Sequence, residues 1–338
     1  MLRKTLVAGA VVAGFMFLLG AGARAEEAAP PAPVYADKGA DTCLFCHDTA
    51  PVTDILRTPH AVKGDSHTPF GEHGCESCHG ASPQHISSAQ SIMEGQKPTL
   101  PTVRFVGKNA SPAEDRNKVC LGCHENGLRM DWHGSKHEDA NLACNSCHTI
   151  HATKDPVLVK KTQPEKCFTC HATQRADSYK FSHHPIREGK VACADCHNPH
   201  GGVGDTKSLK EVTVNETCYN CHAEKRGPLL WEHEPVREDC TNCHTPHGAT
   251  NVRLLKQRPP FLCISCHANS DTHHGQLFGG QNLPGVSPMT NTTAPGNGVA
   301  YTPGGFAADQ IRFQAKGCTN CHSQIHGSNS PGGQFFNR

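Results

Sequence analysis

Ten copies of the pattern Cys-x-x-Cys-His account for all 20 cysteines of the sequence. In such a motif the two thiolates can add to the vinyl groups of one porphyrin, and the adjacent imidazole then faces the iron, which is the attachment chemistry of c-type haem. Cys-x-x-Cys alone is also found in zinc knuckles, redox-active pairs and disulfide frameworks. None of these requires a histidine directly after every second cysteine, so the repeated motif predicts covalent haem.

The motifs define ten predicted attachment sites, each with its own iron ligand. The cysteines predicted to bind haem covalently are Cys43, Cys46, Cys75, Cys78, Cys120, Cys123, Cys144, Cys147, Cys167, Cys170, Cys193, Cys196, Cys218, Cys221, Cys240, Cys243, Cys263, Cys266, Cys318 and Cys321. The predicted proximal iron ligands are His47, His79, His124, His148, His171, His197, His222, His244, His267 and His322.

Each iron needs a second axial ligand, and further histidines recur at regular distances from the motifs. One set lies 13 residues after the first proximal histidine in three modules and 11 residues after it in a fourth: His60, His137, His184 and His233. A second set lies three to six residues after the second proximal histidine: His85, His151, His200, His247 and His326. In the last module His273 and His274 are both available, and His274 is predicted as the distal ligand. The spares are then His67, His73, His133, His183 and His273.

Methionine is the main alternative axial ligand, because it also binds haem iron and raises its reduction potential. Met93, Met130 and Met289 follow no repeat, so two imidazoles per iron are predicted. Which distal histidine serves which iron stays open, because a distal ligand can come from another module.

These ligands must be positioned by five two-haem modules, which begin at Cys43, Cys120, Cys167, Cys218 and Cys263. The 32 glycines and 24 prolines favour turns over long elements, and no long amphipathic or alternating pattern is present. The predicted fold class is a multihaem cytochrome c that is mostly coil with short α-helices and little or no β-sheet. Its repeats predict an elongated array in which each module mainly contacts its neighbours.

The N-terminus has the pattern of a secretory signal peptide, predicted over residues 1–25. Arg3 and Lys4 precede an apolar stretch too short to span a bilayer, and Ala23-Arg24-Ala25 is typical of a cleavage site. Residues 26–42 form an Ala/Pro-rich flexible lead-in, and residues 43–338 are the predicted decahaem domain. Export is consistent with c-type haem, which bacteria attach outside the inner membrane.

The composition leaves little material for an ordinary hydrophobic core. The mature 313 residues would serve ten haems, aromatic residues make up 6%, and the mean hydropathy is −0.51. The porphyrin faces are therefore expected to supply the buried apolar surface, and without haem the chain is expected to be largely unfolded. Loss of Arg3, Lys4 and Arg24 leaves 29 basic against 31 acidic residues, a formal charge of −2, so no nucleic-acid partner is expected.

If every iron carries two imidazoles, no coordination position remains for a substrate. All ten motifs end in histidine, and the remaining histidines outnumber the irons. The sequence therefore predicts electron transfer rather than catalysis, and the chain is not expected to be an enzyme. A line of ten haems would be longer than the roughly 30 Å apolar layer of a membrane, but a polar chain could cross it only inside a protein sheath such as a closed β-barrel.

The sequence resembles the MtrA/DmsE family of periplasmic decahaem c-type cytochromes from about Lys38 to the C-terminus. The resemblance is specific at KGADTCLFCH (38–47), DPVLVKKT (155–162), CYNCHAEKRGPLLWEH (218–233) and CTNCHSQIHGSN (318–329). It implies ten bis-histidine haems in a periplasmic protein that inserts into an outer-membrane β-barrel porin of MtrB type. It also implies electron exchange with periplasmic or inner-membrane cytochromes on one side. On the other side the expected partner is an extracellular multihaem cytochrome or a terminal metal donor or acceptor, as in metal reduction or iron oxidation.

Two alternatives to an outer-membrane electron conduit stay open at this point. One is a soluble periplasmic electron shuttle without a barrel, and the other is a multihaem reductase with a five-coordinate iron. The direction of electron flow, the terminal donor or acceptor and the individual reduction potentials depend on contacts that a sequence does not show.

Overall fold

The computed structural model describes residues 32–93, 95–202, 208–267, 318–331 and 333–337. Backbone contacts divide the chain into two units, Met1–Val34 and Tyr35–Arg338. The predicted signal peptide, residues 26–31 of the lead-in, and His273 and His274 lie outside the described residues.

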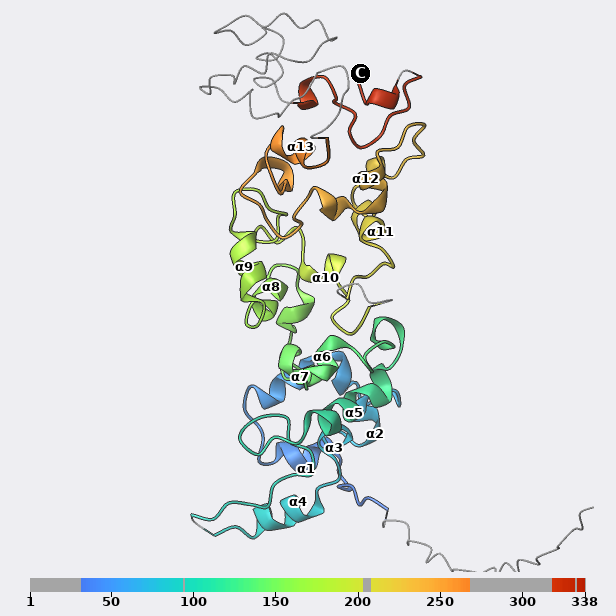
Figure 1. Cartoon of the computed structure of the whole chain (residues 1–338). Coiled ribbons are helices and arrows are strands. Elements are labelled where there is room, and N and C mark those ends of the chain that lie inside the picture. The colour runs from blue at the N-terminus through green and yellow to red at the C-terminus, as the bar shows by residue number, and fades with distance from the viewer. Residues whose placement is uncertain (1–31, 94, 203–207, 268–317, 332, 338) are drawn as a thin grey trace, which may run out of the picture. The chain divides into compact units, whose positions relative to one another are not determined.

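Short helices joined by loops make up the described part of the second unit (Figure 1). The α-helices are α1 (Ala40–Leu44), α2 (Pro69–Glu72), α3 (Glu76–His79), α4 (Pro83–Gln90), α5 (Ala113–His124), α6 (Lys136–Asp139), α7 (Cys144–Cys147), α8 (Gln163–Cys167), α9 (Ala172–Ser178), α10 (Cys193–Cys196), α11 (Val214–Tyr219), α12 (Glu234–Glu238) and α13 (Phe261–His267). The 3-10 helices are η1 (Val52–Arg57), η2 (Pro59–Ala61), η3 (Gly127–Arg129), η4 (Pro156–Leu158), η5 (Ala223–Lys225), η6 (Cys240–Asn242), η7 (Val252–Leu254), η8 (Cys318–Asn320) and η9 (Gly333–Phe335).

Extended pairing within the described ranges is limited to four isolated antiparallel bridges, which join Ser182 to Ala249, His197 to Leu209, Trp231 to Ser328 and His244 to Leu255. The predicted fold content, mostly coil with short helices and little or no sheet, is confirmed.

Helix boundaries follow local chemistry rather than long apolar stripes. The 12-residue α5 has Glu114 and Asp115 in its first turn, where carboxylates stabilise the helix dipole, and a haem motif in its last turn. The side chain of Thr213 accepts a hydrogen bond from Glu216 N and caps α11, which leads into the motif at Cys218. Helices this short are marginal by themselves, so they depend on the contacts that their motifs make.

Each haem motif forms one helical turn. In eight motifs the histidine N–H donates to the carbonyl of the first cysteine at 2.9–3.1 Å, and the other two motifs lie within α5 and α13. Positions i, i+3 and i+4 of a helical turn lie on one face, so both cysteines and the histidine project to the same side. The Cys-x-x-Cys-His spacing thus presents two sulfur atoms and an imidazole to one ligand.

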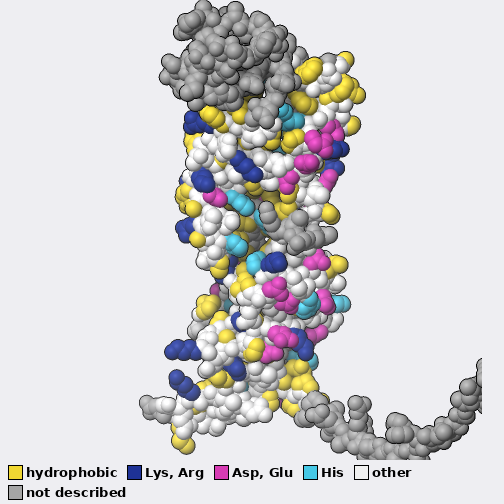
Figure 2. All heavy atoms as spheres, viewed as in Figure 1, with side chains coloured by type: hydrophobic (Ala, Val, Ile, Leu, Met, Phe, Trp, Pro, Cys, Tyr) yellow, Lys and Arg dark blue, Asp and Glu magenta, His cyan; other side chains and the backbone are white. Residues whose placement is uncertain are grey.

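The polypeptide buries few large apolar side chains. A small cluster joins Ala40, Ile55 and Phe70, and five of the ten buried apolar residues among those described are alanines. Figure 2 shows acidic and basic side chains on the same face, with apolar atoms between them. None of the described helices combines the length and the apolar character that crossing a membrane requires.

Candidate haem sites

The structure brings histidines together in nine pairs, each made of one predicted proximal and one predicted distal ligand. Ring centroids are 5.9–6.4 Å apart in the pairs His47–His85, His79–His151, His124–His60, His148–His200, His171–His137, His197–His247, His222–His184, His244–His326 and His267–His233. His322 is described, whereas His274, the remaining predicted distal ligand, lies outside the described residues. We number the haem sites 1 to 10 in the order of their motifs.

The separation of the rings matches a metal ion held between two imidazoles. A metal–nitrogen bond to histidine is about 2.0 Å long and a ring nitrogen lies about 1.2 Å from its centroid, so two opposed ligands place their centroids about 6.4 Å apart. The nine observed separations, 5.9–6.4 Å, agree with this value. With two cysteines beside each proximal histidine, these residues fit a covalently attached, six-coordinate haem.

Hydrogen bonds orient several of the paired rings. Backbone carbonyls accept from Nδ1 of His79 (Val103), His85 (Thr99), His137 (Pro199), His151 (Val52), His184 (Pro246), His233 (Ile325) and His244 (Arg253) at 2.6–3.2 Å. His322 Nδ1 is bound in the same way by the carbonyl of Phe335 at 2.6 Å. A proton fixed on Nδ1 leaves the Nε2 lone pair for iron.

Burial keeps several of the paired histidines in the neutral form that binds metal. It lowers the pKa of His60, His79, His124, His233 and His326 below the usual value and that of His200 to about 4. At neutral pH these imidazoles therefore have a free lone pair without first losing a proton.

The pairing crosses the module boundaries in a regular way. The first haem site of modules two to five takes its distal histidine from the preceding module: His60, His137, His184 and His233. The second haem site of modules one to four takes its distal histidine from the following module: His151, His200, His247 and His326. Only site 1, with His85, is completed within its own module among the nine. Each junction is therefore bridged by two histidine pairs.

The two bridges at a junction are also linked to each other. His137, His184 and His233 donate to the carbonyls of Pro199, Pro246 and Ile325, and each carbonyl belongs to the residue directly before the other distal histidine of that junction. The antiparallel bridges Ser182–Ala249 and Trp231–Ser328 flank the last two of these contacts. A distal ligand of one haem site thus helps to place the distal ligand of the preceding site.

Glycines follow three of the crossing histidines because the preceding module comes close there. Gly201 has a φ of +121°, and a Cβ at this position would overlap the carbonyl oxygen of Asp131. Gly248 has a φ of +154°, and its Cβ would overlap the carbonyl oxygen of Asp177. The His-Gly pairs are a signal in the sequence that our ligand predictions did not use.

Within modules two and four, a buried asparagine three residues before the first cysteine joins the two motifs. Asn117 donates to Leu142 O at 3.0 Å and accepts from Cys144 N at 2.7 Å. Asn215 donates to Val236 O and Arg237 O at 2.9 and 3.0 Å and accepts from Cys240 N at 2.7 Å. Sequence reasoning missed both residues, although their equal offset from the motif was visible.

The sulfur atoms place consecutive haem sites next to one another. In modules one to four, the first cysteines of the two motifs are hydrogen-bonded to each other, which raises the pKa of the earlier cysteine. These pairs are Cys43–Cys75, Cys120–Cys144, Cys167–Cys193 and Cys218–Cys240. Cys263, whose pKa rises to about 11 mainly through burial, lies near Cys318. Between modules, burial and a neighbouring cysteine raise the pKa of Cys78 (beside Cys123), Cys147 (beside Cys167), Cys196 (beside Cys218) and Cys243 (beside Cys266). Every motif is therefore adjacent to the next along the chain.

The four spare histidines among the described residues lie outside the pairs. His67 and His133 contact Asp65 and Glu138 through Nδ1 at 3.0 and 2.8 Å. His183 uses both ring nitrogens, with Lys180 O at 2.7 Å and Glu188 at 3.4 Å. The rings of His73 and Tyr35 stack with their centroids 3.7 Å apart. The 13-residue offset thus selected the members of pairs and passed over their neighbours.

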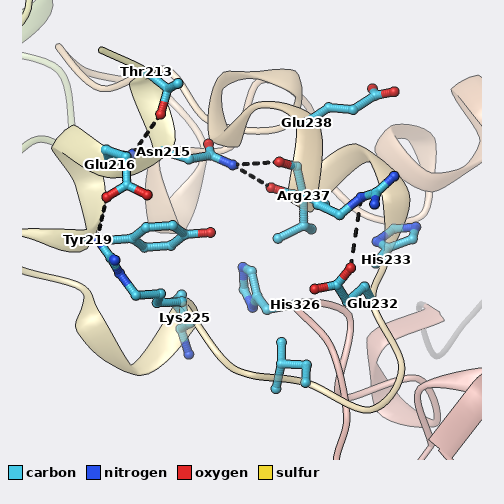
Figure 3. Close-up of a pocket in the computed structure, with 13 residues that line it drawn as sticks. Thr213, Asn215, Glu216, Tyr219, Lys225, Glu232, His233, Arg237, Glu238 and His326 are labelled. Atoms are coloured by element: carbon cyan, nitrogen blue, oxygen red, sulfur yellow. Dashed lines mark hydrogen bonds and ion pairs between the residues drawn. The ribbon is translucent and has the colours of Figure 1, made fainter. Parts of the chain in front are cut away.

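A cavity of about 300 Å³ lies beside haem sites 8 and 9, where His326 and His233 form part of its lining. Figure 3 shows His326 between Tyr219 and His233, with the Asn215 amide directed at α12. Lys225, Arg226 and Arg237 also line it, and Lys225 helps to lower the pKa of His326, after burial. The cavity is thus continuous with the haem sites.

Short helices, ten two-cysteine turns and paired imidazoles define the class of a multihaem c-type cytochrome. Comparison with known proteins agrees: residues 183–227 and 233–272 match the family described as Doubled CXXCH motif, and residues 75–163 match Cytochrome c-type protein NrfB-like. The chain is 42% identical over 305 residues to Multiheme cytochrome MtrA of Shewanella baltica, an alignment that covers 90% of this chain and 83% of that protein. It is 32% identical over 113 residues to Cytochrome c-type protein NrfB of Haemophilus influenzae, covering 30% of this chain and 45% of that protein.

The chain therefore belongs to the MtrA family of multihaem cytochromes. Its Cys-x-x-Cys-His motifs attach haem c covalently, and its general role is electron transport. The predicted family resemblance is confirmed.

Proposed function

We propose that this protein binds ten haems, each between two imidazoles, and conducts electrons between the periplasm and the cell exterior within an outer-membrane β-barrel. The observation that carries the proposal is the continuous adjacency of the ten motifs combined with nine histidine pairs at the spacing of a six-coordinate iron. The bound haem supplies the redox centre. The residues of the chain hold, orient and space those centres.

Ligation by two imidazoles favours electron transfer over catalysis. Iron with both axial positions filled has no place for a small substrate, so each site can exchange electrons but cannot readily bind a molecule to transform it. The tenth site would be completed by His274. On this basis the protein acts as a carrier and not as an enzyme.

Close packing of the sites favours a conductor over a set of independent carriers. Electron tunnelling falls exponentially with distance, and adjacency from the first motif to the last provides a path without a long step. The likeness to Multiheme cytochrome MtrA supports a periplasmic location, and an MtrB-type porin is the partner that the family resemblance implies. Electrons would pass between periplasmic or inner-membrane cytochromes and an extracellular multihaem cytochrome or a terminal metal.

Reconstitution in liposomes tests this function. Holoprotein and its MtrB-type barrel are inserted into vesicles that enclose a redox dye, and a membrane-impermeant reductant is added outside. The conduit predicts bleaching of the dye only when both proteins are present. Bleaching that never occurs, although both proteins are inserted, would support the soluble shuttle. Turnover of a small substrate by the isolated protein would support the reductase.

A further inference from the structure

The proximal histidine of the fourth haem site makes its Nδ1 hydrogen bond to a carboxylate, whereas Nδ1 of the proximal histidines His79, His244 and His322 donates to backbone carbonyls. His148 Nδ1 lies 2.6 Å from Asp155 Oδ2. At site 7 the exposed Glu224 carboxylate lies 3.8 Å from His222 Nδ1, beyond hydrogen-bond distance. The Asp155 side chain is 12% exposed and that of His148 is 27% exposed. The contact is therefore a short hydrogen bond to a carboxylate that is largely shielded from water.

The carboxylate is held in place by the backbone on either side of it. Asp155 Oδ1 accepts from Thr149 N at 3.2 Å and from Val157 N at 3.3 Å, and the second bond caps η4. These bonds leave Oδ2 directed at His148. The geometry is thus built into the loop that connects the proximal ligand to η4.

The opposite ligand of this site has no comparable contact. His200 Nδ1 is buried and makes no hydrogen bond with the described residues. Asp155 is therefore the one described acceptor that reaches Nδ1 of either imidazole of site 4. Any effect of ligand hydrogen bonding on the fourth haem site would therefore act mainly through Asp155.

A carboxylate acceptor changes the electronic character of the imidazole it contacts. By attracting the Nδ1 proton, it makes the ring a stronger electron donor to the metal at Nε2. More donation stabilises the oxidised iron, and hydrogen bonding around the ligand is one of the main determinants of haem potential. A shielded charge close to the ring acts in the same direction, because water screens it poorly.

We propose that Asp155 positions His148 and lowers the reduction potential of haem site 4, so that this site is an energetic step within the line of haems. The inference rests on the proposed function, in which His148 and His200 bind the fourth iron. An electron passing along the line would have to climb to this site and descend from it. Asp155 would thereby affect the rate of conduction without touching the haem itself.

Spectroelectrochemical titration of purified holoprotein tests the proposal in Asp155→Asn and Asp155→Ser. The asparagine variant keeps the size of the side chain, and serine keeps a capping oxygen for η4, but neither has a charge. In both, about one tenth of the haem absorbance should titrate at higher potential. A tenfold change in the equilibrium constant for reduction corresponds to about 59 mV for one electron, and a shift of at least this size is expected.

Asp65→Asn is the matched control, because Asp65 contacts Nδ1 of the unpaired His67 at 3.0 Å. Its titration curve should equal that of the unaltered protein. Near-infrared magnetic circular dichroism of each oxidised variant should show the same number of bis-histidine haems as the unaltered protein, with one charge-transfer band displaced in the Asp155 variants only.

Unchanged potentials in both Asp155 variants would overturn the proposal. So would a high-spin iron in both, because Asp155 would then only position the ligand and would not lower the reduction potential. If only the asparagine variant loses a histidine ligand, the reduction potential of the serine variant decides whether the proposal holds. If the unaltered protein itself lacks bis-histidine iron at ten sites, the proposed function fails instead, and the spectrum of that protein reveals this before any variant is compared.

Discussion

The crossing of histidines between modules predicts a specific effect of His184→Ala. His184 belongs to module three, but its ring faces His222 of module four at 6.4 Å between centroids. Removal of the imidazole should leave one iron of ten, that of site 7, with a single axial ligand. Ferrous five-coordinate haem binds carbon monoxide, whereas bis-histidine haem does not readily do so. The variant should therefore bind one carbon monoxide per chain, and the unaltered protein should bind none.

The neighbouring His183 provides the control for this experiment. It contacts Lys180 O and Glu188 and faces no proximal ligand, so His183→Ala should bind no carbon monoxide. The His184 variant also loses the hydrogen bond to Pro246 O, worth about 1 kcal/mol, which helps to place the ligand of site 6. Site 6 keeps both imidazoles, however, so the stoichiometry should stay at one.

Photometric titration of the reduced proteins with carbon monoxide gives the stoichiometry directly. Free imidazole should compete with the gas in His184→Ala and restore the low-spin spectrum. Binding by His183→Ala, no binding by His184→Ala, or two gas molecules per chain in the latter would refute the pairing.

Three further predictions concern stability and folding. Asn215→Ala removes three hydrogen bonds of a buried side chain, so the free energy of unfolding should fall by about 2–3 kcal/mol. The measurement is a denaturant titration followed by Soret circular dichroism. The control Asn220→Ala removes an exposed hydrogen bond and should change the free energy of unfolding by less than about 0.5 kcal/mol. Gly248→Ala should displace His247, because the new Cβ would meet a backbone carbonyl, and electron paramagnetic resonance should then detect some high-spin iron. The control Gly64→Ala places its Cβ in open space and should produce no high-spin iron. Chain exported without haem attachment should have little helical circular dichroism, because its helices are short and its apolar core is small.

Each of these has a contradicting result. Equal unfolding energies for the two asparagine variants would show that Asn215 does not join its motifs. An all-low-spin Gly248 variant would show that the preceding module can move away. A cooperative thermal transition in the haem-free chain would show that the polypeptide folds without porphyrin.

The sequence allowed the attachment motifs and the general fold to be predicted because both depend on local chemistry. A Cys-x-x-Cys-His turn is closed by its own backbone, and repeats at equal offsets predicted His60, His137 and His184 as distal ligands without reference to the rest of the chain. Pairing was beyond such reasoning. His137 and Pro199 are 62 residues apart, and nothing local to either indicates that the two meet.

Other features were visible in the sequence but needed the structure to acquire meaning. Asn117 and Asn215 share one offset from a motif, and glycine follows three of the crossing histidines, yet a single polar residue or glycine has many possible roles. Only the approach of a second backbone shows why these residue types occur there. The role proposed for Asp155 likewise depends on its burial against His148.

Near-infrared magnetic circular dichroism of the oxidised holoprotein, normalised to its iron content, distinguishes iron with two histidine ligands from high-spin iron. Ten irons per chain are expected, all low-spin, with charge-transfer bands of bis-histidine ligation. Fewer than ten irons, or a high-spin band that accounts for one haem or more, would contradict this expectation.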